Sequence, residues 1–268
     1  MNKLTFASLN TYGGVFNIYD LTRRYKNIGY YFNCSKVDII HFQEIFTYYH
    51  LFLLRQLLKS YLYCVYTKSS FGPKGGLVTF SRLPIQKINY FSYLRKHVPY
   101  FSRSLIEILT QRGILITTLI NHQLTLFNTH LTAVLNHNWS VSSKYYLELT
   151  AEINQFHQLI KKPNQAKSIL ISGDFNIAKK SQLYQQLTIL PGLFDINKTD
   201  PKPTRHLEYA LPGQKVNCVD YIFIFDLKKT CKITNPCRLF ENKLKLDGKK
   251  TAYVSDHIGL SVEIDLPG

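Results

Sequence analysis

Short apolar runs that end in polar residues recur along this sequence. The clearest lies in residues 168–177, SILISGDFNI, where three aliphatic residues lead into a serine and a glycine. A continuous apolar run bounded by a turn signal predicts a buried β-strand. Because side chains alternate along an extended chain, Asp174 and Asn176 are expected on one side of this segment and Phe175 on the other.

The pair Asp174 and Asn176 allows two interpretations. The two side chains can cap the following helix and close an Asx-turn. Alternatively, they can meet at the mouth of a sheet, where a metal-bound water or a phosphate oxygen would bind. The choice depends on whether other predicted strands end in the same way.

The same pattern predicts alternating strands and helices over the whole chain. Apolar runs predict strands at 4–9, 37–42, 61–66, 75–81, 219–225 and 258–264, and a hairpin that pairs 107–120 with 123–128. Helical spacing of apolar residues predicts helices at 19–32, 51–58 and 141–160, and a short one around 183–187. We expect a strand plus an exposed loop at 90–106, and a long loop beside the site at 197–217.

Polar side chains gather at the predicted ends and starts of these strands. They are Asn10, Glu44, His130, Asp174, Asn176, Asp220, Asp256 and His257. A glutamate at the end of a buried strand is costly unless a lysine, another ion-pair partner or a metal ion meets it. Of the nine histidines, only the two in the strand-flanking motifs NTHL and SDH receive a functional assignment.

Composition predicts a single globular domain over residues 1–268, which we expect to be monomeric. No apolar run approaches the length of a membrane-spanning helix, and the N-terminus lacks the apolar segment of a signal peptide. We therefore expect a cytoplasmic protein, with a specialised export route left open. Five cysteines without CxxC spacing are typical of a reduced protein without structural zinc.

The charge balance is strongly basic. The chain has 33 Lys and Arg against 17 Asp and Glu, a net charge of +16, and such an excess attracts polyanions such as nucleic acid or an anionic membrane surface. The basic residues lie in scattered pairs and form no single block, so charge favours a polyanionic partner without naming one.

The ordered set of motifs resembles the endonuclease/exonuclease/phosphatase superfamily, the DNase I-like fold of nucleases, sphingomyelinases and inositol-polyphosphate 5-phosphatases. The matching stretches are LTFASLN, DIIHFQE, GGLVTFSRLPI, LFNTHL, ILISGDFN, VDYIFI and SDHIGL, in the order of the family from the first residues to nearly the last. The resemblance implies an α/β fold, a four-layered sandwich of two packed mixed β-sheets flanked by helices. It also implies a metal-dependent hydrolase of phosphoric esters.

The resemblance assigns a metal site. Glu44 would be the principal ligand of Mg²⁺, with Mn²⁺ or Ca²⁺ as alternatives, and Asn10 would lie beside it on the metal or the phosphate. Asp256 would support the metal or the attacking water. Hard carboxylate and amide oxygens suit such a cation, which keeps several waters and takes up a substrate phosphate oxygen.

The resemblance also assigns the groups around the phosphate. Asp174 would orient the attacking water, and Asn176 would hold a phosphate oxygen. His257 would be either the general base or the group that polarises the phosphate, with its tautomer fixed by Asp220. His130 would stabilise the charge that develops at phosphorus.

One departure from the family concerns the helix after the His130 motif. Many relatives carry an Arg and a Gln there, whereas this chain has SSKYYLELTAEINQF. Aromatic, apolar and acidic residues occupy the corresponding positions, so that support for the site is absent or replaced.

The substrate is left open between classes. A sphingomyelinase-like phospholipase C is favoured by the strand RGILITTL that begins at Arg112, by NTHLTA, and by aromatic residues at 90–101 and Trp139 that could contact a membrane. Ordinary packing of these aromatic residues is the alternative. A nuclease is favoured by the charge of +16, and an inositol-phosphate phosphatase by Lys202 and Arg205. A binding protein without activity is disfavoured, because the chain carries the full set of candidate acid, base and metal-binding residues.

Overall fold

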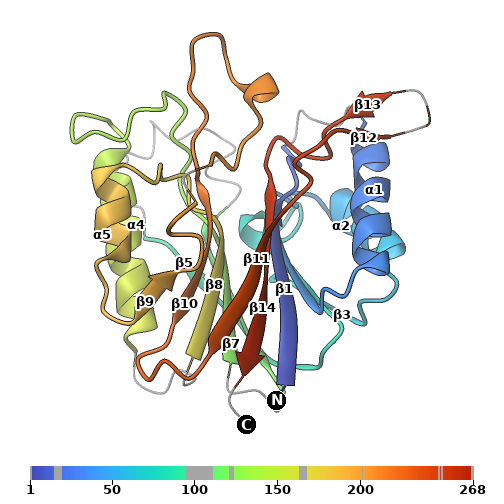
Figure 1. Ribbon diagram of the computed structural model, residues 1–268, viewed down its shortest axis with the longest axis horizontal. Coiled ribbons are helices and arrows are strands. Elements are labelled where there is room, and N and C mark those ends of the chain that lie inside the picture. Colours follow the sequence, from blue (N-terminus) through green and yellow to red (C-terminus); the bar gives the residue numbers. More distant parts are fainter. Residues whose placement is uncertain are drawn as a thin grey trace.

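The computed structural model describes residues 2–14, 20–94, 111–120, 124–162, 168–200, 202–246, 248 and 250–266. The hairpin turn expected at 121–122 and the loop expected at 95–106 lie outside these ranges. Two six-stranded sheets pack face to face, and helices cover the outer face of each (Figure 1).

The first sheet has the strand order β11-β14-β1-β2-β4-β3. Its strands are β1 (Asn2–Asn10), β2 (Ile39–Gln43), β3 (Tyr63–Val65), β4 (Val78–Ser81), β11 (Lys232–Leu239) and β14 (Gly259–Leu266). The β1–β2 pair is parallel and the other pairs are antiparallel. A 3₁₀ turn, η1 (Lys74–Gly76), precedes β4, so this strand is shorter than its apolar run suggests.

The second sheet has the order β5-β6-β7-β8-β10-β9. Its strands are β5 (Ile85–Ser92), β6 (Gly113–Leu119), β7 (Leu124–His130), β8 (Ser168–Asp174), β9 (Leu193–Asp195) and β10 (Asp220–Phe225). Only β7 and β8 pair in parallel among these strands. Outside both sheets lie the pair β12 (Leu244–Lys245) and β13 (Thr251–Ala252), and the 3₁₀ turn η3 (Leu207–Tyr209) within the expected long loop.

In the described part of the chain, two helices cover each sheet. In Figure 1, α1 (Leu21–Cys34) and α2 (Tyr48–Leu57) lie outside the first sheet, and α4 (Tyr146–Ile160) and α5 (Gln182–Thr188) lie outside the second. The predicted helix at 141–160 is wrong at its start, because residues 141–145 form turns closed by the hydroxyl groups of the NWSVSS segment. No described helix is long and apolar enough to span a membrane.

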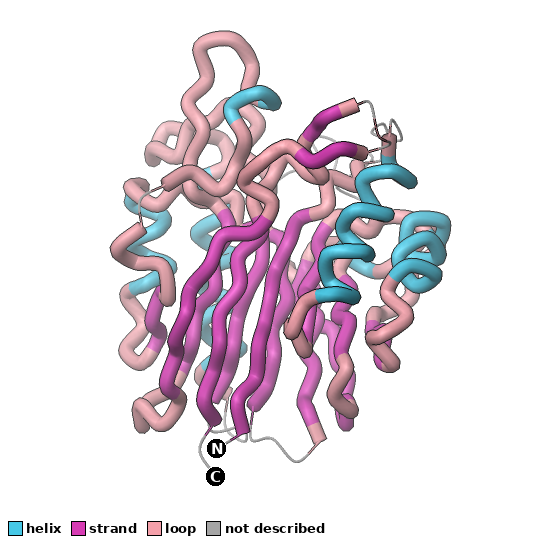
Figure 2. The backbone as a smooth tube through the Cα atoms, turned by 45° about the vertical axis from the view of Figure 1, so that its right-hand side comes forward, coloured by secondary structure: helices cyan, strands magenta, loops and turns pink. Residues whose placement is uncertain are grey.

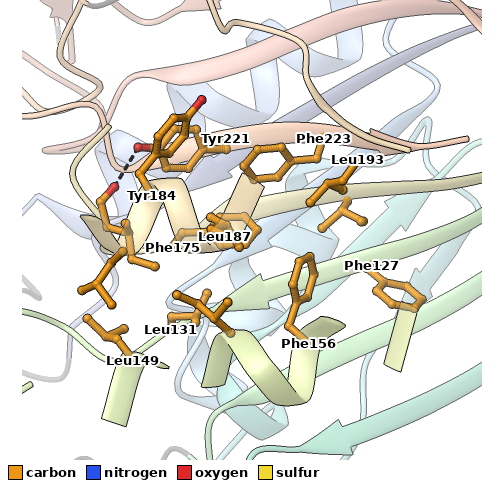
Figure 3. Close-up of a cluster of buried hydrophobic side chains, with 14 of the residues drawn as sticks. Phe127, Leu131, Leu149, Phe156, Phe175, Tyr184, Leu187, Leu193, Tyr221 and Phe223 are labelled. Carbon is orange, nitrogen blue, oxygen red and sulfur yellow. Dashed lines mark hydrogen bonds between the residues drawn. The ribbon is translucent and has the colours of Figure 1, made fainter. Parts of the chain in front are cut away.

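Three apolar clusters fill the spaces between the four layers. One lies between α4, α5 and the second sheet and is rich in aromatic rings, including Phe156, Phe175 and Phe223 (Figure 3). Another lies under α1 and α2. The third, with Phe6 and Leu170, fills the interface between the two sheets. These clusters confirm the predicted four-layered α/β sandwich.

The strand directions bring the polar ends to one edge. The parallel pairs β1–β2 and β7–β8 end there, while β10 and β14 begin there. This edge lies opposite the two chain termini (Figures 1 and 2). The residues singled out at strand ends therefore converge on a single region, although they come from both sheets.

Candidate active site

Asn10 links the two sheets at this edge. Its Nδ2 donates to Glu44 Oε1, 3.2 Å away, and to Asp174 Oδ2, 3.0 Å away. Its backbone carbonyl accepts a hydrogen bond from Ser255 Oγ at 2.6 Å. Asn10 at the end of β1 is thus hydrogen-bonded to Glu44 after β2, to Asp174 at the end of β8 and to Ser255 before β14.

His257 and Asp220 form the shortest charged contact between the sheets at this edge. His257 Nδ1 lies 2.8 Å from Asp220 Oδ2, and its Nε2 lies 3.7 Å from Asp174 Oδ2. The hydroxyl of Thr204 donates to the same Asp220 oxygen at 2.5 Å. These contacts fix Nδ1 of the imidazole on Asp220 and leave Nε2 facing the site.

Local backbone geometry explains how β8 presents Asp174. Gly173 has φ of 148°, and a Cβ there would lie 1.8 Å from the carbonyl oxygen of Thr129. Only glycine permits this close approach of β8 to β7. Asp174 Oδ1 then accepts a hydrogen bond from the backbone N–H of Asn176, which has φ of 53°. Asp174 therefore closes an Asx-turn with one oxygen and faces the two histidines with the other. The expected cap of the following helix is wrong, because Ser181 caps α5.

The electrostatics favour a cationic His257 beside an ionised Asp174. Burial opposes the charge of His257, but Asp220, Asp256 and Asp174 outweigh it and raise its pKa to about 10. Burial likewise opposes the charge of Asp174, but His257 and His130 outweigh it and lower the pKa of this carboxyl. The surrounding carboxylates thus favour the protonated form of His257, which donates a hydrogen bond from each ring nitrogen.

His130 is the neutral partner of Asp174. Its Nε2 lies 3.4 Å from Asp174 Oδ2. Burial, reinforced by the positive charge of Arg112, lowers the pKa of His130 to about 4. Arg112 donates to the carbonyl of Leu131 at 2.7 Å, behind the histidine. The predicted substrate residue Arg112 is therefore held in the wall of the site.

The site carries more negative than positive charge. Four carboxylates, Glu44, Asp174, Asp220 and Asp256, converge on one imidazolium and on Arg205, whose Nη2 lies 3.0 Å from Asp256 Oδ2. Burial, and then repulsion from Asp256, raises the pKa of Glu44 to about 7. A cation beside such a carboxyl would relieve the cost of its ionisation. The donor set therefore fits a hard divalent cation.

That cation could be held either by Asp174, Asp220 and His257 or by Glu44 with Asn10 beside it. Among the described residues, Asp174, Asp220 and His257 offer ligand atoms that lie within 4.8 Å of one another. The facing atoms of Asp220 and His257 are already hydrogen-bonded to each other. We therefore favour Glu44 as the principal ligand, because the one side-chain hydrogen bond described for it comes from Asn10.

The remaining predicted residues differ in their relation to the site. Asn176 donates from Nδ2 to the carbonyl of Leu131 at 3.1 Å. The indole N–H of Trp139 donates to the backbone carbonyl of Asn176 at 2.8 Å, so this ring packs beneath the site. Lys202 is exposed, and its backbone N–H donates a hydrogen bond to Asp200 Oδ1 at 3.0 Å.

Three supporting residues escaped the sequence analysis. Thr204 binds Asp220 from the long loop, where no local pattern indicates it. Ser255 could have been found in the SDH motif, since it also accepts the N–H of His257 at 3.0 Å. Glu152 of α4 accepts hydrogen bonds from the N–H and hydroxyl of Thr132 at 3.0 and 2.7 Å. It supports the loop after His130 from the helix that departs from the family pattern.

Structural comparison identifies the fold. The chain resembles D. rerio TDP2 in complex with a single-strand DNA product (17% identity, 99% of this chain and 100% of that chain, TM-score 0.75). It also resembles beta toxin from Staphylococcus aureus (17% identity, 97% and 99%, TM-score 0.72). A third similar structure is sphingomyelinase C from Streptomyces griseocarneus (14% identity, 98% and 99%, TM-score 0.71). At these identities the similarity shows the fold alone.

Sequence comparison identifies the family. No curated protein sequence matches the chain significantly. The model of the Endonuclease/Exonuclease/phosphatase family matches residues 7–257, which include the polar residues from Asn10 to His257. The protein is therefore a member of the endonuclease/exonuclease/phosphatase family, with its DNase I-like fold, and an enzyme that hydrolyses phosphoric esters with the divalent-metal dependence general to that family.

Proposed function

We propose that this enzyme is a Mg²⁺-dependent phosphodiesterase of the phospholipase C type, which releases the phosphorylated head group of a phospholipid. The observation that carries the chemistry is the convergence of His130, Asp174 and His257 on one edge, with Asp174 between the two imidazoles. An ionised carboxylate flanked by two N–H donors can orient a water molecule while the donors bind phosphate oxygens.

The chain's own residues then perform an in-line displacement. Asp174 orients the water and accepts its proton as the water oxygen bonds to phosphorus. The bond from phosphorus to the lipid oxygen breaks, and the departing alkoxide takes a proton from solvent. The cationic His257 stabilises the charge on the phosphate oxygens. The neutral imidazole of His130 donates a hydrogen bond to the same phosphate.

Glu44, Asn10 and Asp256 are the residues that would hold Mg²⁺. When bound, the ion would supply Lewis-acid polarisation of the phosphate and charge neutralisation at the leaving oxygen. The amide of Asn10 fixes the position of the Glu44 carboxylate, and Arg205 fixes that of Asp256. The carboxylate and amide donors favour Mg²⁺ or Mn²⁺ over softer metals.

The lipid substrate is supported by local sequence. The segments RGILITTL and NTHLTA lie side by side as β6 and the end of β7, and both are similar to sphingomyelinases. The structural likeness to beta toxin and sphingomyelinase C is compatible with this assignment.

A nuclease is the second candidate. It is supported by the net charge of +16 and by the likeness to a TDP2 bound to single-strand DNA product. A basic surface raises the affinity for any polyanion, so charge alone does not separate nucleic acid from anionic lipid. Substrate turnover separates them.

We would compare Mg²⁺-dependent hydrolysis of sphingomyelin, lysophospholipid, plasmid DNA and a short RNA, with His257→Ala as the blank. We expect lipid turnover that falls at least about 10³-fold in the variant, because the imidazolium stabilises the transition state. A His157→Ala variant on the outer helix α4 controls for loss of a histidine. Nicking of DNA without lipid turnover would establish the nuclease instead, and near-normal activity of His257→Ala would refute the mechanism.

A further inference from the structure

Four large aromatic side chains stand exposed around the start of α2. Tyr48, Tyr49 and Phe52 are 38%, 58% and 56% exposed, and Phe71 in the neighbouring loop is 61% exposed. The spacing of the first three places them on one side of the helix, because residues three and four apart are neighbours on its surface. The opposite side of α2 is buried through Leu51 and Leu54. We call these four residues the aromatic platform.

The platform is held rigidly. The hydroxyl of Thr47 accepts the N–H of His50 at 3.1 Å and so caps the helix. The loop is tied to the same turn, because the N–H of Tyr48 donates to the carbonyl of Phe71 at 3.1 Å. The hydroxyl of Tyr48 also donates to the carbonyl of Ser69 at 2.8 Å. A surface whose backbone is already ordered loses less conformational entropy on binding.

The platform lies close to the catalytic edge. Tyr48 follows the metal-ligand candidate Glu44 by four residues, a span of at most about 14 Å even when fully extended. The connecting segment is fixed by a hydrogen bond from the N–H of Ile45 to the carbonyl of Gly76 at 2.9 Å. A surface seated on the platform would therefore lie beside the mouth of the site.

The segment of the chain that carries the platform is basic. Between Glu44 and Glu107 the sequence contains nine Lys and Arg and no Asp or Glu. Of these, Arg55, Lys59 and Lys68 are exposed on or near α2. Exposed aromatic rings together with basic residues on and near the same helix complement an anionic membrane, whose interface accepts the rings while its head groups attract the cations.

We propose that the aromatic platform is a docking surface for anionic phospholipid membranes and that it presents the catalytic edge to lipid head groups. This inference rests on the proposed phospholipase function. A membrane is favoured over nucleic acid because the rings project from the outer side of a helix. Single-stranded nucleic acid is bound in grooves that follow its backbone and stack its bases in succession.

The test measures binding separately from turnover. Sedimentation with phosphatidylcholine vesicles, with and without phosphatidylserine, is carried out in EDTA so that no lipid is hydrolysed. We expect the double variant Tyr49→Ser/Phe52→Ser to lower the partition coefficient on phosphatidylserine vesicles by about 10- to 100-fold, because two large apolar side chains no longer enter the interface. Lys68→Gln should reduce binding only on the anionic vesicles.

Leu227→Ser is the matched control. Leu227 is 68% exposed and follows β10 at the end of the sheet opposite the site. Equal loss of binding in this control, or unchanged binding in the double variant, would overturn the proposal. So would binding of a single-stranded oligonucleotide that depends on Phe52 while vesicles are not bound.

A soluble substrate separates this proposal from the proposed function. The double variant should hydrolyse bis(p-nitrophenyl) phosphate with Mg²⁺ at the rate of the wild type, since neither side chain belongs to the catalytic set. If the double variant still binds vesicles normally and still hydrolyses the soluble substrate, the docking proposal is refuted while the proposed function stands. Absence of any phosphodiester hydrolysis in the wild type refutes the proposed function.

Discussion

At the scale of single residues, the function of His257 depends on the carboxylates around it. Asp220 lies 2.8 Å from Nδ1, and Asp174 and Asp256 lie 3.7 and 3.8 Å from Nε2. Their combined negative charge outweighs the effect of burial and raises the pKa of the imidazole to about 10. Of the two roles assigned by resemblance, this charge supports our proposal that His257 polarises the phosphate.

Replacing Asp220 with Asn tests this balance. The variant keeps the size of the side chain and removes one charge, so we expect the pKa of His257 in the metal-free protein to fall from about 10 by at least one unit. Proton NMR of the imidazole across a pH titration measures it. An unchanged pKa in Asp220→Asn would show that Asp174 and Asp256 alone hold the charge.

At the scale of elements, helix α4 supports the loop that follows His130. Glu152 is fully buried and accepts both the N–H and the hydroxyl of Thr132. An acidic side chain of α4 therefore supports the loop after His130 in this chain.

Variants of Glu152 measure this support. Glu152→Ala leaves the buried N–H of Thr132 without this acceptor, and we expect a loss of about 2–4 kcal/mol in the free energy of unfolding. Glu152→Gln keeps one carbonyl oxygen and should lose about half as much. Urea denaturation of both variants gives the values, and equal stability of Ala and Gln variants would contradict the assignment.

At the scale of the whole molecule, the site joins the two sheets at one edge. Asn10, Glu44 and His257 belong to the side of the first sheet, and Asp174 and Asp220 to the second. A cation held among these carboxylates would link the two sheets at this edge. Metal binding and stability of the sandwich are therefore expected to be coupled.

The pH dependence of stability tests this coupling. The pKa of Glu44 is about 7 in the folded protein against 4.5 ordinarily, so the folded state holds a proton that the unfolded state has lost between these values. The contribution of Glu44 to stability therefore falls as the pH rises from 4.5 through 7. In the metal-free protein, Glu44→Gln should gain about 1–3 kcal/mol at pH 8 and almost nothing at pH 4.

Magnesium should reverse the order of stability of the wild type and Glu44→Gln at pH 8. We expect Mg²⁺ to raise the melting temperature of the wild type at pH 8 and to leave that of Glu44→Gln nearly unchanged. Differential scanning calorimetry with and without EDTA measures both effects. A wild-type melting temperature that does not respond to Mg²⁺ would contradict the assignment of Glu44 as a ligand.

The sequence by itself determined the main strands and the polar residues at their ends. An apolar run that ends in a polar residue is a local signal, so the strands that end at or next to Asn10, Glu44, His130 and Asp174 were predicted without knowledge of the fold. Helix boundaries were less accurate. The start of α4 depends on hydroxyl contacts within the preceding turns, which apolar spacing does not reveal.

Only the tertiary structure decided which residues meet. Strand β11 was not predicted, because its Pro236 and the positive φ of Asn235 are tolerated only at a sheet edge, where β14 pairs with it around a bulge. Thr204 and Asp220, and likewise Thr132 and Glu152, are brought together by packing between segments distant in sequence. Such contacts depend on how whole elements pack against one another. Strand formation and residue chemistry depend on the local sequence, so they can be predicted from it.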